Sequence, residues 1–140
     1  MKINKPKVLK CCEKDILDSY NNNEFYNAIF NNNINENITI SNITFDSCVF
    51  NNIDFNNIKL EDVSLIDVIF DGCDLSNISF DYKLLSRVVF KNCKMLGASF
   101  IESSLTDIVI DNCVCKYLNL SNTNINRIEI KKSDLSESSF

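Results

Sequence analysis

The feature that most constrains this chain is an apolar residue at every fifth position. In a sequence that is 45% hydrophobic, an unbroken run of this length has a chance probability of roughly 10⁻⁷. Neither an α-helix nor a flat strand has this period, so it predicts a tandem array of short units. The run comprises Ile40, Phe45, Phe50, Phe55, Leu60, Leu65, Phe70, Leu75, Phe80, Leu85, Phe90, Met95, Phe100, Leu105, Ile110, Cys115, Leu120, Ile125, Ile130, Leu135 and Phe140.

A second series lies two residues before the first. It runs from Ile38 to Ser138, is apolar or small, and is interrupted only by Lys83. Two inward side chains separated by one outward side chain are typical of a strand. The remaining two residues of each unit must then turn the chain. The pattern therefore predicts a coil with short straight sides.

The turns are predicted at the position two residues after each central apolar residue. Asn, Asp or Gly often stands there, and these residues tolerate left-handed backbone angles. This explains how a chain with only 2 Gly and 1 Pro can turn so often. The predicted corners of this kind are Asn42, Asn52, Asn57, Asp62, Asp67, Gly72, Asn77, Asn92, Gly97, Asp107, Asn112 and Asn122.

Residues 73–77 (Cys-Asp-Leu-Ser-Asn) and 133–137 (Ser-Asp-Leu-Ser-Glu) resemble the five-residue motif of the pentapeptide-repeat family. The resemblance covers roughly residues 23–140. It implies an all-β solenoid: a right-handed quadrilateral β-helix with twenty residues per coil and nearly six coils. Two features depart from the family pattern. Many small-residue positions hold Ile or Val, and the preference for Asp or Asn has largely moved to the corner.

Two interruptions of the period predict local irregularities. Asn33 and Asn35 fall in inward slots, so we expect residues 31–37 to be irregular, with Ile34 taking an inward place. Lys83 predicts a bulge that turns its side chain outward, because an ammonium group is rarely buried without a partner.

The first residues lack the period. We expect residues 1–22 to form a helical capping segment and residues 23–140 to form the β-helix. A cap of this kind would hide the strand edges of the first coil. The basis for a helix is an apolar stripe at helical spacing after Pro6, made of Leu9, Cys12, Ile16 and Tyr20.

One face of the predicted coil carries a row of outward apolar residues, which we call the stripe. Two interpretations are open: β-branched residues favour strands in general and the N-terminal segment covers the row, or the row pairs with a second copy or a partner protein. The stripe consists of Ile29, Val49, Ile69, Val89 and Val109, and Glu129 ends the row.

The final coil offers a second candidate surface. The sequence ends at Phe140 in full register, so the last coil would leave unpaired backbone groups and apolar side chains open. Some members of the family that the chain resembles dimerise through their C-terminal coils. We therefore expect a homodimer, with Ile125, Ile130, Leu135 and Phe140 as the candidate C-terminal dimer end.

The sequence gives no indication of catalysis. It contains no His, which excludes an imidazole base or a Ser-His-Asp relay. Cys73, Cys93 and Cys113 are predicted to stack as parallel inward side chains, whereas metal ligands converge on a point. A filled coil also predicts no cleft. We expect no enzymatic activity, no cofactor and no metal site.

The net charge of the chain limits the classes of partner that it can bind. The net charge is −5, and residues 1–20 carry five Lys against three acidic residues, which leaves the remainder at −7. This argues against direct nucleic-acid binding, which needs basic side chains to neutralise phosphates. With no apolar run of membrane-spanning length and no secretory signal, we expect no membrane association, a cytoplasmic location and reduced Cys.

Two functions remain. The first is a non-catalytic scaffold for protein–protein interaction. The alternative comes from the resemblance, because some members of the family are DNA-mimicking proteins that bind DNA gyrase or topoisomerase IV. Those that confer quinolone resistance typically carry projecting loops, for which the register from residue 40 to residue 140 leaves no room. The acidic residues here are also spread over all faces.

Overall fold

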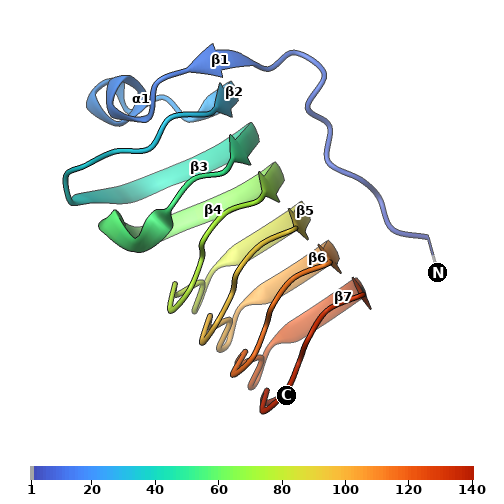
Figure 1. The fold of residues 1–140 in the computed structure, drawn as a ribbon. Coiled ribbons are helices and arrows are strands. Elements are labelled where there is room, and N and C mark those ends of the chain that lie inside the picture. The colour runs from blue at the N-terminus through green and yellow to red at the C-terminus, as the bar shows by residue number, and fades with distance from the viewer. Residues whose placement is uncertain (1) are drawn as a thin grey trace.

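The computed structural model describes residues 2–140. Seven parallel strands form one sheet in sequence order, wound into a β-solenoid of about six turns with one short helix near the N-terminus (Figure 1). The fold predicted from the repeat is therefore confirmed. The elements are β1 (Cys12–Lys14), α1 (Ile16–Asn22), β2 (Tyr26–Phe30), β3 (Ile38–Asn51), the 3-10 turn η1 (Phe55–Asn57), β4 (Ile58–Asp71), β5 (Leu84–Lys91), β6 (Ser104–Asp111) and β7 (Asn124–Lys131).

From β2 onward the strands pair in a register of twenty residues, whereas β1 pairs with β2 at an offset of sixteen. Val49 lies beside Ile69, Ile69 beside Val89 and Val89 beside Val109. No bulge or inserted loop shifts this register in residues 38–131, so the prediction of a bulge at Lys83 is wrong. Four five-residue units therefore make one coil.

The corners have the predicted backbone. Every predicted corner except Asn57 has a positive φ, between 51° at Asp62 and 69° at Gly72. Less tolerant residues, such as Arg87 and Tyr117, adopt the same conformation where the repeat requires it. The corner geometry thus belongs to the repeat and not to one residue type. Among the predicted corners, Asn57 alone lacks the left-handed conformation.

The interior is filled by the two inward series. Phe50, Phe70 and Phe90 stack along the axis with ring centroids 5.2 and 5.1 Å apart, and all three are buried. Large aromatic side chains of this kind contribute much of the apolar area that a core removes from water. Cys73 and Cys93 fill smaller inward slots, and their thiols donate to the carbonyl oxygens of Phe50 and Phe70.

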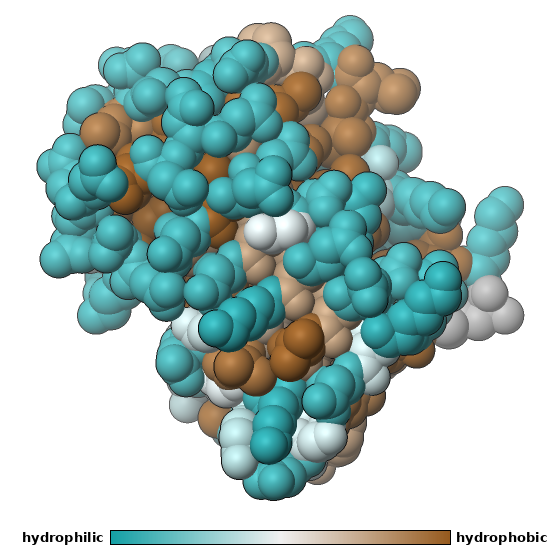
Figure 2. Space-filling view, in the orientation of Figure 1, coloured by the Kyte–Doolittle hydropathy of each residue, from teal (hydrophilic) through white to brown (hydrophobic). Residues whose placement is uncertain are grey.

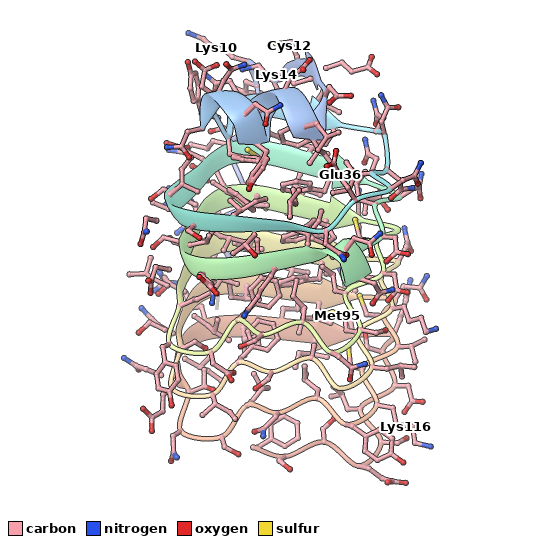
Figure 3. The ribbon with its side chains drawn as sticks, turned by 90° about the vertical axis from the view of Figure 1, so that its left-hand side faces the viewer. Lys10, Cys12, Lys14, Glu36, Met95 and Lys116 are labelled. Carbon is pink, nitrogen blue, oxygen red and sulfur yellow. The ribbon has the colours of Figure 1, made fainter. Side chains whose placement is uncertain are left out.

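The N-terminal end is closed by α1, which lies across the first turns of the solenoid (Figure 3). The carboxylate of Asp15 accepts hydrogen bonds from the amides of Leu17 and Asp18, and Asn23 ends the helix in a left-handed conformation. The helix is shorter than the one predicted from the helical spacing of apolar residues after Pro6. Leu9 is 97% exposed, and Cys12 belongs to β1 because that segment pairs with β2.

The irregular segment is confirmed. Residues 31–37 contain no strand, and Ile34 is buried as predicted. None of the helices within residues 2–140 has the length and apolar character needed to cross a bilayer.

Candidate interaction surfaces

The stripe lies where the register predicted it, along β2 to β6. Its side chains are half-buried, and Val109 is buried at 8% exposure. Strand neighbours above and below cover part of each side chain. The stripe is therefore a partly covered row and not an open apolar face.

An extended N-terminal segment runs beside the stripe; we call residues 2–11 the strap. Figure 1 shows it outside the coils, passing from β1 toward the C-terminal turns. The amide of Lys7 donates to Asp67 at 3.0 Å, and the backbone and side-chain nitrogens of Asn4 donate to Asp107 at 3.3 and 3.2 Å. Asp67 and Asp107 precede the stripe residues Ile69 and Val109 by two positions, so the strap is fixed next to the stripe.

Asp67 and Asp107 also belong to a row of alternating charges along one corner of the coil. Arg87 forms a two-point ion pair with Asp67, with nitrogen–oxygen distances of 2.6 and 3.1 Å. Arg127 does the same with Asp107, at 2.5 and 3.0 Å. Planar guanidinium groups suit such pairing with carboxylates. Each carboxylate therefore joins two coils and the strap.

The two carboxylates are held in the charged form. Hydrogen bonds from Arg127 lower the pKa of Asp107 to about 2, despite its burial. Burial raises the pKa of Asp67, but hydrogen bonds from Arg87 and from the Lys7 amide outweigh this, so that its pKa is also lowered. This row was not among the sequence predictions, although acidic and basic residues twenty positions apart were an available signal.

The final coil exposes part of its interior. Ile125 is 40% exposed and Phe140 is 73% exposed, whereas Ile130 and Leu135 are half-buried. In the preceding coil the corresponding residues, such as Leu105 and Leu120, are buried. The four predicted residues thus share one end of the solenoid.

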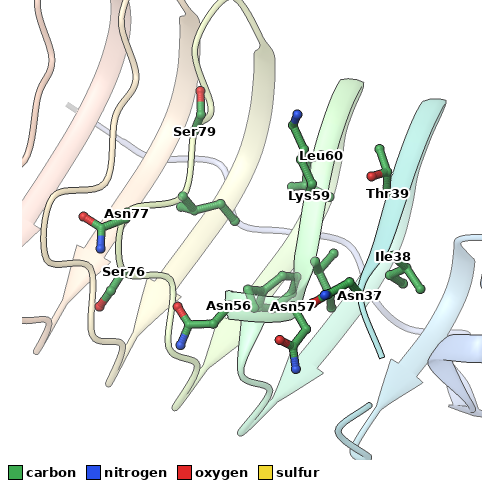
Figure 4. A pocket seen from close by; sticks show the side chains of 13 residues that line it. Asn37, Ile38, Thr39, Asn56, Asn57, Lys59, Leu60, Ser76, Asn77 and Ser79 are labelled. Carbon is green, nitrogen blue, oxygen red and sulfur yellow. The ribbon is translucent and has the colours of Figure 1, made fainter. Parts of the chain in front are cut away.

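A cleft opens on one side of the solenoid, which corrects the prediction that a filled coil has none. It lies between residues 57–64 and residues 77–84, and we call it the seam; residues 37–39 and 55–56 also line its larger part. Its larger part has a volume of about 620 Å³. Figure 4 shows Lys59 and Leu60 on β4 and Asn77 and Ser79 on the neighbouring coil, on opposite sides of the opening.

The interrupting residue Lys83 lies at the end of the seam. It is half-buried beside Glu61, Asp62, Asp81 and Tyr82 in a smaller opening of about 350 Å³. Burial lowers the pKa of Lys83, and the three carboxylates act in the opposite direction. In the equivalent slots of the next two coils, Ser103 and Thr123 donate to the Phe100 carbonyl oxygen. Lys83 cannot do this with its long side chain, and the seam gives it a path to solvent.

The cysteine ladder is a packing feature. Cys48, Cys73, Cys93, Cys113 and Cys115 are buried free thiols. Across residues 2–140, no group of three or more acidic or Cys side chains is arranged to hold a metal ion.

Polar residues cover most of the face in Figure 2, where apolar residues form only small separate patches.

Known structures with this fold provide the comparison. HetL, a pentapeptide-repeat protein involved in heterocyst differentiation regulation from the cyanobacterium Nostoc sp. strain PCC 7120, superimposes with a TM-score of 0.63 at 16% identity, over 81% of this chain and 54% of HetL. Full-length QnrB1, a plasmid-mediated fluoroquinolone resistance protein, gives a TM-score of 0.52 at 20% identity, over 83% of this chain and 53% of QnrB1. The chain spans about half the length of these proteins.

Sequence comparison gives the family. No curated protein is significantly similar to the chain in sequence. A family model described as a pentapeptide repeat region matches residues 63–140, and a second, of eight pentapeptide repeats, matches residues 41–77. The matches cover the same coils that the period of five and the twenty-residue register define. The chain therefore belongs to the pentapeptide-repeat family.

Proposed function

We propose that the protein is a non-catalytic scaffold for protein–protein interaction that works as a homodimer. The observation that carries this proposal is the exposed end of the last coil. Ile125 and Phe140 are open to solvent there, beside the outer edge of β7. A second copy placed end to end would cover the apolar side chains and pair the strand edge.

The stripe is the other candidate surface for the dimer. It supports the proposal less strongly because its side chains are already half-buried and because the strap lies next to it. A partner would have to displace the strap or pack beside it. The end of the solenoid needs no such rearrangement.

Light scattering on the purified protein tests the proposal. We expect a mass of twice 16.0 kDa for the wild type and a monomer mass for Ile125→Glu and Phe140→Glu. Val114→Glu is a matched control, because Val114 is similarly exposed but lies on a lateral face of the coil. If the dimer persists in both end variants but dissociates in Val89→Glu, the interface lies at the stripe and not at the coil end. A monomeric wild type at all concentrations would reject the homodimer.

The second candidate is a DNA-mimicking inhibitor of DNA gyrase or topoisomerase IV. It is supported by the net charge of −5 and by the fold that the chain shares with QnrB1. The row of Asp67 and Asp107 argues against it, because Arg87 and Arg127 neutralise that edge. A gyrase supercoiling assay with and without a quinolone separates the candidates. If the protein at micromolar concentration neither inhibits supercoiling nor protects gyrase from the quinolone, the DNA-mimic function is excluded.

A further inference from the structure

The seam is a break in the backbone pairing between two successive coils. In later coils the amide of Ser99 donates to the Ile78 carbonyl and the amide of Asn119 to the Ala98 carbonyl. The equivalent bond from Ser79 to Ile58 is absent from the described chain. The strand ladder between β4 and the next coil likewise begins only at Leu65. Residues 57–64 and 77–84 therefore face each other without the bonds that join the other coils.

The cause is a difference between two corners. Asn77 has a φ of +59°, and the corners at residues 97, 117 and 137 of the following coils are also left-handed. Asn57 instead ends the 3-10 turn η1, without a positive φ. The chain consequently leaves these two corners in different directions. These two segments, the walls of the seam, meet again at Leu65 and Leu85, after the next pair of left-handed corners, Asp62 and Tyr82.

Each wall is suited to bind an extended peptide. Residues 58–64 form the first half of β4, which is paired with β3 on one side only. An unpaired strand edge offers amide and carbonyl groups that an added strand can satisfy. Ile58, Leu60 and Ile78 line the opening from the core side at 6–8% exposure. The volume of about 620 Å³ lies within the range of ligand pockets, roughly 300–1,000 Å³.

Charge selects the kind of peptide. Glu61, Asp62 and Asp81 stand at the corner end of the seam around a single Lys83. Lys59 forms an ion pair with Glu61 at 3.3 Å. Within residues 2–140 the Asp62 carboxylate has neither a hydrogen-bond donor nor an ion-pair partner. This end of the seam therefore carries an uncompensated negative charge.

We propose that the seam is a docking site for an extended segment of another protein, bound as an added strand with a basic side chain beside Asp62. This site is separate from the coil end and the stripe. It deepens the scaffold function by naming a class of partner segment, and it rests on that function. It can fail while the homodimer stands, because the two are measured on different surfaces.

The first experiment is hydrogen–deuterium exchange on the full-length protein. We expect the amides that face the seam, those of Leu60, Asp62 and Ser79, to exchange at least about tenfold faster than the amides of residues 104–111, which pair on both sides. Equal protection of both regions would mean that the seam is closed in solution and would overturn the proposal.

The second experiment measures binding of a defined probe. The probe is a fluorescent, end-capped peptide of six residues, in which threonine and isoleucine alternate and the last two residues are arginine. It is added to the full-length protein, and binding is followed by fluorescence anisotropy. We expect a micromolar dissociation constant and slower exchange in both walls. A probe whose backbone amides are methylated cannot pair as a strand, so we expect it not to bind.

Variants assign the binding to the seam. Ser79→Trp should abolish binding by filling the opening, whereas Ser139→Trp occupies the equivalent exposed position three coils away and should not. Asp62→Asn keeps a residue suited to the left-handed corner and should weaken binding about fivefold, the size expected of one exposed charge pair. Glu102→Gln is its matched control. No binding by the wild type, or equal binding by Ser79→Trp, would refute the site, while the dimer mass reports on the scaffold independently.

Discussion

The two halves of β4 make opposite contacts with the next coil. Residues 65–71 pair in unbroken register with residues 85–91, and the row of Asp67 and Arg87 lies on this closed half. Residues 58–64 leave the seam open. Both halves have inward apolar residues and the same twenty-residue spacing. The corner conformation, and not the apolar period, therefore decides whether neighbouring coils pair.

The largest expected effect comes from the core beside the closed half. Phe90→Ala removes a fully buried ring that stacks on Phe70 and should lower the free energy of unfolding by about 3–5 kcal/mol. Ile78→Ala, at the wall of the seam, should lower the free energy of unfolding by about 2 kcal/mol, near the lower limit for such truncations, because water can enter there. Urea unfolding measures both. Equal losses would show that the seam does not relax the core.

The next effect concerns the two kinds of acidic corner. Asp107→Ala removes the two-point ion pair with Arg127 and the strap contacts of Asn4, and should cost about 1.5–3 kcal/mol. The Asp62 carboxylate bonds to nothing in residues 2–140, so Asp62→Ala adds only the strain of alanine at the left-handed conformation, which Asp107→Ala also carries, and should cost about 1 kcal/mol. Similar losses for the two variants would remove any role for the ion-pair row.

The corner explanation can be tested directly with alanine. Gly97→Ala places a side chain at a φ of +67° and should cost about 1–2 kcal/mol; its Cβ would also lie 2.6 Å from the Asn77 Oδ1 atom. Asn57→Ala occupies the corner without a positive φ and should cost less than about 0.5 kcal/mol. Thermal unfolding of the pair measures the difference. A large loss at Asn57 would contradict the assignment of its backbone conformation.

The smallest effect is confined to acidic solution. The pKa values of Asp67 and Asp107 lie below the value of about 3.9 expected in the unfolded chain, at about 2 for Asp107. Their contribution to stability is therefore complete above that unfolded value and is lost as the pH falls through the lowered pKa values, which for Asp107 means through about 2. Urea unfolding between pH 5 and pH 2 should show a steeper loss for the wild type than for Asp107→Asn. Parallel curves would argue against the ion pair.

Much of the fold was predictable because the repeat is local. Each unit repeats the same inward pair and the same corner, so the register and the buried Phe and Cys positions follow from counting. The interaction surfaces were less predictable. The positions of Ile125 and Phe140 followed from the register, whereas the anchoring of Asn4 on Asp107 joins residues far apart in sequence, without a shared motif.

The seam shows where the sequence stops being informative. Asn stands at both corner 57 and corner 77, and Asn is compatible with either backbone conformation. Lys83 marks the region as unusual, but nothing in the period indicates which coil would separate from its neighbour.

The sequence by itself determined the solenoid, its twenty-residue coil, its filled core and the absence of His chemistry. These depend on periodicity and residue type, which every coil repeats. Only the tertiary structure decided that the strap lies beside the stripe, that Asp67 and Asp107 join neighbouring coils, and that one wall of β4 is left unpaired. Each of these depends on how residues distant along the chain meet in space, and on a corner conformation that Asn57 alone does not specify.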